Sequence, residues 1–167
     1  MSSSRFAHNA LVCWALAIAS PVVGWAQSSY LPQASEYAVA GSMPGDQVRP
    51  QLSVGTTGGF LVWEDNITDG YGLGVSALRL DSSFSSVLSP FRVNLTAAGD
   101  QSRPQVSLLK DDGAAFVWQG GPQSFQHIYA RFLSRSNIWV TDDVQVNTAT
   151  KAYQIDPVVA TLANSNI

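Results

Sequence analysis

Cysteine and histidine are scarce in this chain, and their scarcity excludes several kinds of chemistry. The 167 residues include one cysteine, Cys13, which lies in a segment that we expect to be removed. Without it, no disulfide framework, thiolate metal site or cysteine nucleophile can form. His127 is then the only histidine, and no Gly-x-Ser-x-Gly elbow accompanies it. These absences argue against a histidine triad or a multi-histidine metal site, and we expect no enzymatic activity.

Positive charge is also sparse. Nine Lys and Arg residues stand against twelve Asp and Glu residues, which gives a net charge of −3, and no basic cluster occurs. Such a chain offers no electrostatic footprint for nucleic acid or for an anionic membrane. We therefore expect partners that are neutral, cationic or bridged by a cation, and we expect no nucleic acid.

The N-terminus has the order of a secretory signal peptide. A short polar leader precedes an apolar run over residues 10–19, and small residues occupy the −3 and −1 positions of a cut before Gln27. That run is about half of the roughly 20 residues that a membrane-spanning helix needs. We predict a signal peptide over residues 1–26, a linker over 27–35, and no membrane span after cleavage. The predicted location is secreted, either extracellular or at the cell surface.

A repeated motif dominates the rest of the chain. Residues 45–53, Gly-Asp-Gln-Val-Arg-Pro-Gln-Leu-Ser, return at 99–107 as Gly-Asp-Gln-Ser-Arg-Pro-Gln-Val-Ser, with seven of nine positions identical. A decayed third copy begins at Gln154, and it has Asp156 where the other copies have arginine. A repeat of this length is typical of solenoids, propellers and other arrays.

Short apolar segments separated by Gly, Pro, Asn, Asp and Ser predict four strands in each repeat. No sustained 3.6-residue apolar period occurs after the leader, so we expect no substantial helix. Four strands in about 53 residues match one propeller blade. The expected strands are residues 51–54, 60–64, 74–80 and 91–94, then 105–108, 114–119, 127–133 and 144–147.

The predicted fold class is therefore all-β: a partial β-propeller of four-stranded antiparallel blades of about 53 residues, truncated within a third blade. Residues 36–44 are expected to be the last strand of an incomplete blade. Residues 45–98 and 99–151 form two complete blades, and residues 152–167 begin the third. On this interpretation, further blades of the same protein would complete the array.

The repeated segments resemble a known class of repeat. The resemblance rests on Gly-Asp-Gln-x-Arg-Pro-Gln-x-Ser, a Gly-rich turn and Phe-Leu-Val-Trp-Glu-Asp, followed by Asp-Gly-x-Gly-Leu-Gly at residues 69–74. Residues 45–65, 99–119 and 154–162 carry it. These resemble the propeller-like (FG-GAP or integrin-alpha-like) repeats of large bacterial secreted and cell-surface proteins, which often also carry laminin-G-like (concanavalin-type) lectin domains. The second copy departs by having Gln119-Gly120-Gly121 in place of Glu-Asp-Asn. The resemblance implies extracellular adhesion or carbohydrate binding, and it implies no catalytic residue.

Two pairs of equivalent residues are candidate ligand contacts. Trp63 and Trp118 follow matched apolar residues, and an indole either packs against the next blade or stacks on a sugar. Arg49 and Arg103 recur before a proline, where they either latch the inter-blade loop through charge-assisted hydrogen bonds or bind an acidic glycan. We expect the structural role for both pairs and keep ligand binding as the alternative.

One acidic loop is a candidate calcium site. Asp65, Asn66 and Asp69 gather oxygen atoms before Gly70, and Ca²⁺ takes six to eight oxygen ligands. The spacing differs from the EF-hand pattern, and ordinary turn chemistry also explains these residues. Calcium is thus the one candidate cofactor.

We expect a non-enzymatic extracellular repeat module that mediates adhesion or binds a glycan or a surface protein. Two alternatives remain. The chain could be part of the propeller of an exported carbohydrate-active enzyme whose catalytic acids lie elsewhere, or a structural spacer beside a lectin domain.

Overall fold

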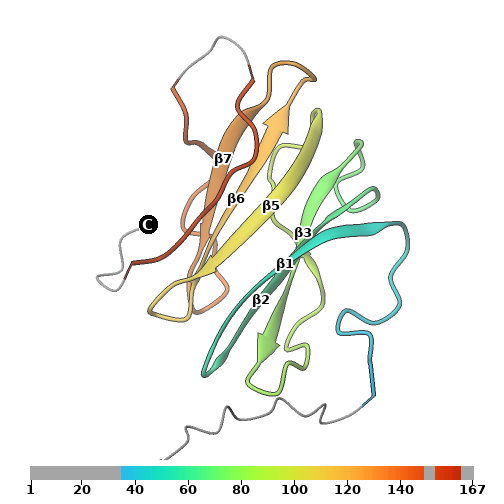
Figure 1. The fold of residues 1–167 in the computed structure, drawn as a ribbon, viewed down its shortest axis with the longest axis vertical. Coiled ribbons are helices and arrows are strands. Elements are labelled where there is room, and N and C mark those ends of the chain that lie inside the picture. Colours follow the sequence, from blue (N-terminus) through green and yellow to red (C-terminus); the bar gives the residue numbers. More distant parts are fainter. Residues whose placement is uncertain (1–34, 149–152, 163–167) are drawn as a thin grey trace, which may run out of the picture. The chain divides into compact units, whose positions relative to one another are not determined.

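A computed structural model describes residues 35–148 and 153–162 (Figure 1). The predicted signal peptide and nearly all of the predicted linker lie outside these residues. The folded unit begins at Tyr37. No helix that is long and apolar enough to cross a membrane occurs in the part of the chain that the structure describes.

The described residues form an all-β fold without helix, as predicted. There are two four-stranded antiparallel sheets, in the order β1-β2-β3-β4 and β5-β6-β7-β8. We call residues 45–98, which contain the first sheet, repeat 1, and residues 99–151, which contain the second, repeat 2. The strands are β1 (Gln47–Gly55), β2 (Gly58–Asp65), β3 (Gly74–Asp81), β4 (Phe91–Arg92), β5 (Asp100–Leu108), β6 (Ala114–Gly121), β7 (His127–Leu133) and β8 (Val144–Gln145).

The first strand of each sheet begins several residues earlier than the sequence suggested, because a bulge carries it past the proline. In β1 the pairing register shifts between Val48 and Gln51, and in β5 it shifts between Ser102 and Gln105. Arg49 and Arg103 lie inside these bulges with φ angles of 52° and 53°. A bulge leaves its extra residue outside the ladder, so the proline that follows removes no ladder hydrogen bond.

Residues 36–44, predicted to be the last strand of an incomplete blade, contain turns and bends and form no strand. Val39, Ala40 and Met43 from this segment pack instead against a small cluster made by Trp63, Leu78 and Leu80. The segment therefore covers the face of the first sheet on which Trp63 lies.

The two sheets pack through the main hydrophobic core. Phe60 and Val62 on the first sheet lie in one buried cluster with Phe116 and Trp118 on the second. The rings of Phe60 and Phe116 meet edge to face, with centroids 5.7 Å apart.

The packing is head to tail. Trp118 lies in the core between the sheets, whereas the equivalent Trp63 lies in the separate cluster on the opposite face of the first sheet. Repeat 2 thus presents its tryptophan face to the other face of repeat 1, and β5 packs against β1 and β2. A sandwich with two-fold symmetry would bring the equivalent faces of the two sheets together. Head-to-tail packing instead joins unlike faces, so the same contact can be repeated with a further unit at each end.

The third motif copy continues the pattern without forming a strand. Residues 153–162 run along the second sheet (Figure 1), where the Asp156 amide donates to Gln119 Oε1 and Ser107 Oγ lies 2.7 Å from Thr161 Oγ1. The same relations link repeat 2 to repeat 1, because the Arg103 amide donates to Glu64 Oε1 and the Leu108 amide donates to Ser53 Oγ. The third copy therefore begins over repeat 2 as β5 begins over repeat 1.

Candidate functional site

In the second and third copies, the residue at the recurring arginine position is held through its backbone amide. The amide of Arg103 donates a 2.6 Å hydrogen bond to Glu64 of the preceding repeat, and the amide of Asp156 donates to Gln119 in the same way. Asp156 also has a positive φ, 58°. Asp adopts this left-handed conformation more readily than most residues. The position therefore requires a left-handed residue that donates its amide, and Asp156 meets both requirements without an arginine side chain.

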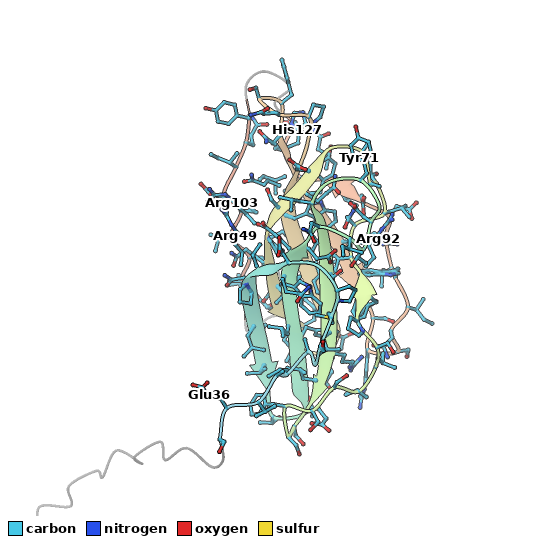
Figure 2. The ribbon with its side chains drawn as sticks, turned by 90° about the vertical axis from the view of Figure 1, so that its right-hand side faces the viewer. Glu36, Arg49, Tyr71, Arg92, Arg103 and His127 are labelled. Carbon is cyan, nitrogen blue, oxygen red and sulfur yellow. The ribbon has the colours of Figure 1, made fainter. Side chains whose placement is uncertain are left out.

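The guanidinium groups of Arg49 and Arg103 form ion pairs and remain about half exposed. Arg49 Nε lies 3.6 Å from Glu64 Oε1, and Arg103 pairs with Asp156 of the third copy. Figure 2 shows both arginines projecting from the same edge of the unit. The partner of Arg103 thus comes from the following copy, which fits a latch between consecutive repeats.

An asparagine that the sequence analysis did not single out joins one repeat to the next. Asn94 Oδ1 accepts the Val75 amide, and Asn94 Nδ2 donates to Gln101 Oε1 and to the Thr96 carbonyl. Asn147 repeats the arrangement, accepting the amide of Ile128 and donating to Gln154. The available signal was an asparagine seven residues before the motif glutamine in both places. In the earliest copy, Ala40 stands at this position.

His127 belongs to the same network. Its Nδ1 lies 3.0 Å from Gln154 Oε1 and 3.0 Å from Asn147 Nδ2. These amide partners hold the ring where repeat 2 meets the third copy, which is a structural arrangement.

The two candidate tryptophans are both buried. Trp118 is 1% exposed and stacks on Tyr129 with ring centroids 6.1 Å apart. Trp63 is 3% exposed, and its cross-strand neighbour is Ser76. Neither indole face lies open enough for a sugar ring to stack on it, so packing is their main role.

The serine beside Trp63 leaves a pocket that we call the Asp65 pocket. It has a volume of about 100 Å³, and its lining includes Gln47, Trp63, Asp65 and Ser76. Asp65 Oδ1 accepts the amides of Ile67 and Thr68 at 3.0 and 2.6 Å, and so caps the turn after β2.

The other oxygen of this carboxylate has no partner. Asp65 Oδ2 and Ser76 Oγ are buried, and neither makes a hydrogen bond within the described residues. Asp65 is 3% exposed and Ser76 is 1% exposed. Buried polar atoms without partners are rare in folded proteins, and each one calls for an explanation.

The electrostatic environment keeps Asp65 ionised. Burial is the largest influence and by itself raises the pKa of this carboxyl. The Ser76 hydroxyl, which lies near the carboxylate but outside hydrogen-bond geometry, and the hydrogen bonds from Thr68 and Ile67 together outweigh burial, so the pKa lies below its usual value of 3.8. The pocket therefore holds a negative charge at neutral pH.

Repeat 2 has an equivalent position with a different filling. Strand pairing places Tyr129 opposite Trp118, as it places Ser76 opposite Trp63. Gly120 stands two residues after Trp118, where repeat 1 has Asp65. The tyrosine ring fills the space, and the remaining hollow is about 30 Å³.

The residues of the predicted calcium loop point to separate partners. Asn66 exchanges hydrogen bonds with Asp46, while Asp69 accepts from the Tyr71 amide and from Asn94 Nδ2. Within the described residues, no group of three or more His, Cys, Asp or Glu side chains is placed to hold a metal. The structure thus does not bring Asp65, Asn66 and Asp69 together around one point, and calcium binding stays a prediction.

Comparison of the chain with models of protein families, with curated proteins and with solved structures found no match.

Proposed function

We propose that this chain is a non-enzymatic extracellular binding module, whose repeats stack as blades of a β-propeller and which binds a glycan or other cell-surface material through the Asp65 pocket. The signal-peptide pattern supports export. The resemblance to repeats of secreted and surface proteins supports adhesion or carbohydrate binding.

Head-to-tail packing supports the blade arrangement. Equivalent residues of consecutive copies are neighbours, as with Arg103 and Asp156. Blades around an axis have this relation, because each unit is a rotated copy of the one before. A radial array also gives each blade neighbours that bury both of its faces.

The observation that carries the binding function is the difference between the two equivalent pockets. Repeat 2 fills the position with the stacked pair Trp118 and Tyr129, which shows that the fold has an apolar solution there. Repeat 1 instead keeps a buried carboxylate and a hydroxyl with unpartnered oxygens. Buried polar atoms without partners are rare in folded proteins and call for an explanation, and a binding role supplies one.

No feature of the pocket favours the alternative of a glycoside hydrolase. That reaction requires two carboxyl groups facing one glycosidic bond. Asp65 is the only acidic residue among those that line the pocket. A binding role needs only the groups that the pocket has.

A glycan array tests the proposal, with the purified chain compared with Ser76→Tyr. The substitution places in repeat 1 the residue that repeat 2 carries at the same position, so we expect it to fill the pocket and leave the fold intact. We expect the chain to bind a defined set of glycans and the variant to lose that binding. Circular dichroism and a melting curve verify that Ser76→Tyr is folded.

Asp142→Asn is a matched control, because it alters an exposed side chain in the bend that precedes β8, in repeat 2. We expect it to bind as the unaltered chain does. Failure to bind any glycan, or equal binding by folded Ser76→Tyr, would overturn the proposal.

A further inference from the structure

We propose that the Asp65 pocket receives a protonated primary amine, as the group by which the ligand is recognised. The inference rests on the proposed function, because it names the chemistry that this binding site takes.

Three hydrogen-bond acceptors without partners line the pocket. Asp65 Oδ2 and Ser76 Oγ are the buried pair. Gln47 is the third: its Nε2 donates to the carbonyls of Pro44 and Gly45, and its Oε1 accepts no hydrogen bond from the described residues. In repeat 2 the equivalent Oε1 of Gln101 accepts from Asn94, but Ala40 stands at the corresponding position before Gln47.

A primary ammonium group matches this set, because it carries three donors and no acceptor. A hydroxyl group carries one donor and would leave two of the acceptors unpaired. A guanidinium group is planar and binds a carboxylate best through two oxygens, but Asp65 Oδ1 is already occupied by two backbone amides. The number of donors thus favours an ammonium group.

The charge of the pocket also favours a cation. None of the residues that line it is Lys, Arg or His. The ion pairs found among the described residues use Glu64, Asp112 and Asp156, and none of them uses Asp65. The Asp65 carboxylate therefore has no cation beside it among the lining residues, and a bound ammonium group supplies the opposite charge.

The dimensions limit what can enter. A volume of about 100 Å³ is well below the roughly 300–1,000 Å³ of pockets that hold a whole drug-sized ligand. The pocket accepts one terminal group while the rest of the ligand stays outside. Trp63 forms part of the wall.

A divalent metal fits less well. Ca²⁺ takes six to eight oxygen ligands, and the neighbouring acidic residue Asp69 already accepts hydrogen bonds from Tyr71 and Asn94.

Two sources could supply the amine: an amino sugar with a free amine, or the side chain of lysine on a surface protein. They share the chemistry that the pocket recognises.

The test is a titration of the purified chain with ethylammonium, followed by heteronuclear NMR. We expect shifts confined to resonances of Asp65, Ser76, Trp63 and their neighbours. Ethanol is the matched neutral probe, and we expect it to bind at least about ten-fold more weakly, because hydrogen bonds to charged groups are the stronger ones. Glucosamine and Nα-acetyl-lysine then distinguish the two sources, with N-acetylglucosamine as the neutral sugar.

Variants separate the pocket from general charge effects. Asp65→Asn keeps the shape and the turn-capping oxygen, and we expect it to weaken ethylammonium binding about ten-fold or more. Ser76→Tyr should abolish binding by filling the space. Asp142→Asn removes one negative charge elsewhere, and we expect it to bind ethylammonium as the unaltered chain does.

The outcomes distinguish this inference from the proposed function. Glycan binding that Ser76→Tyr abolishes, with no ethylammonium binding, would overturn the amine and leave the binding function standing. Equal binding of ethanol and ethylammonium, unchanged binding by Asp65→Asn, or Ca²⁺ binding at the same resonances would also overturn it. If neither the glycans nor any of the amines bind, both proposals fail.

Discussion

Repeat 1 carries Asp65 and Ser76 around Trp63, whereas repeat 2 carries Gly120 and Tyr129 around Trp118. The strand pairing is the same in both places, since Ser76 lies opposite Trp63 and Tyr129 lies opposite Trp118. In repeat 2 the aromatic pair fills the position and becomes part of the core between the sheets. In repeat 1 the space stays open and polar. The difference separates what the fold needs from what the proposed ligand would need.

Other features are the same in both repeats, and these are structural. A bulge with a left-handed residue, an amide captured by Glu64 or Gln119, and an asparagine that bonds to the next motif glutamine all recur. Each of these joins one repeat to the next. A feature that every copy keeps is thus explained by stacking, and a feature that one copy keeps alone needs another explanation.

The largest expected effect concerns the two tryptophans. Replacing a buried tryptophan with alanine costs about 3–5 kcal/mol, through lost burial and a cavity. We expect Trp118→Ala to lie at the upper end, because Trp118 holds the two sheets together. Trp63→Ala should lie at the lower end, because Trp63 packs in a smaller cluster beside a pocket. Urea unfolding measures both.

The milder variants Trp118→Phe and Trp63→Phe keep this comparison measurable if an alanine variant does not fold. We expect the same order with smaller losses. A larger loss at Trp63 would show that the core between the sheets is not the main stabilising interface.

The second prediction compares Asn94 with Asn147. Asn94→Ala leaves the buried Val75 amide without its acceptor and breaks the bond to Gln101, so we expect a loss of about 2–3 kcal/mol in the free energy of unfolding. Asn147 is only half-buried, and we expect Asn147→Ala to cost about 1 kcal/mol. Thermal or urea unfolding measures the difference. Equal losses would contradict the view that burial sets the cost of this link.

The secondary structure was largely predictable from the sequence, because each strand is bounded by turn-forming residues and the motif repeats. The bulge was missed: Arg49 has an ordinary side chain for a strand, and only the three-dimensional register shows its positive φ. The strand expected over residues 36–44 is not formed, and this segment packs on the Trp63 cluster instead.

The candidate site was predictable only in part. Trp63 was recognised as a packing residue, with sugar stacking as the alternative, and Asp65 was recognised as a candidate calcium ligand. Their combination depends on Ser76, which lies on another strand and has no distinctive sequence context. Cross-strand pairing brings Ser76 opposite Trp63, and sequence reasoning had no means to weigh a small residue there.

The third prediction builds the missing pocket into repeat 2. The pair Gly120→Asp and Tyr129→Ser reproduces the residues of repeat 1 at the equivalent positions. We expect a loss of about 1–3 kcal/mol, since a stacked ring is removed and a charge is introduced. We also expect the number of bound ethylammonium ions per chain to rise from one to two, which a titration measures.

Tyr129→Ser alone is the matched control for that experiment. It opens the space without adding a carboxylate, and Asp143, which also lines this hollow, already accepts from the Leu95 and Thr96 amides. We therefore expect the loss of stability without the second bound ion. A second site in this single variant would mean that space, and not charge, determines what the pocket takes.

The smallest expected effect is the pH dependence that Asp65 gives to repeat 1. Because the folded pKa of Asp65 lies below 3.8, its charged form stabilises the folded chain above that pH, and this contribution is lost as the pH falls through the folded pKa. None of the other residues that line the pocket is titratable. At neutral pH, Asp65→Asn should therefore cost about 1 kcal/mol, the difference between a charged and a neutral acceptor for the two turn amides. Below pH 3.8 the unfolding free energies of the variant and of the unaltered chain should converge. If the gap instead widened in acid, the carboxylate would be destabilising when ionised, and the turn amides would not be enough to hold a charge in the pocket without a bound cation.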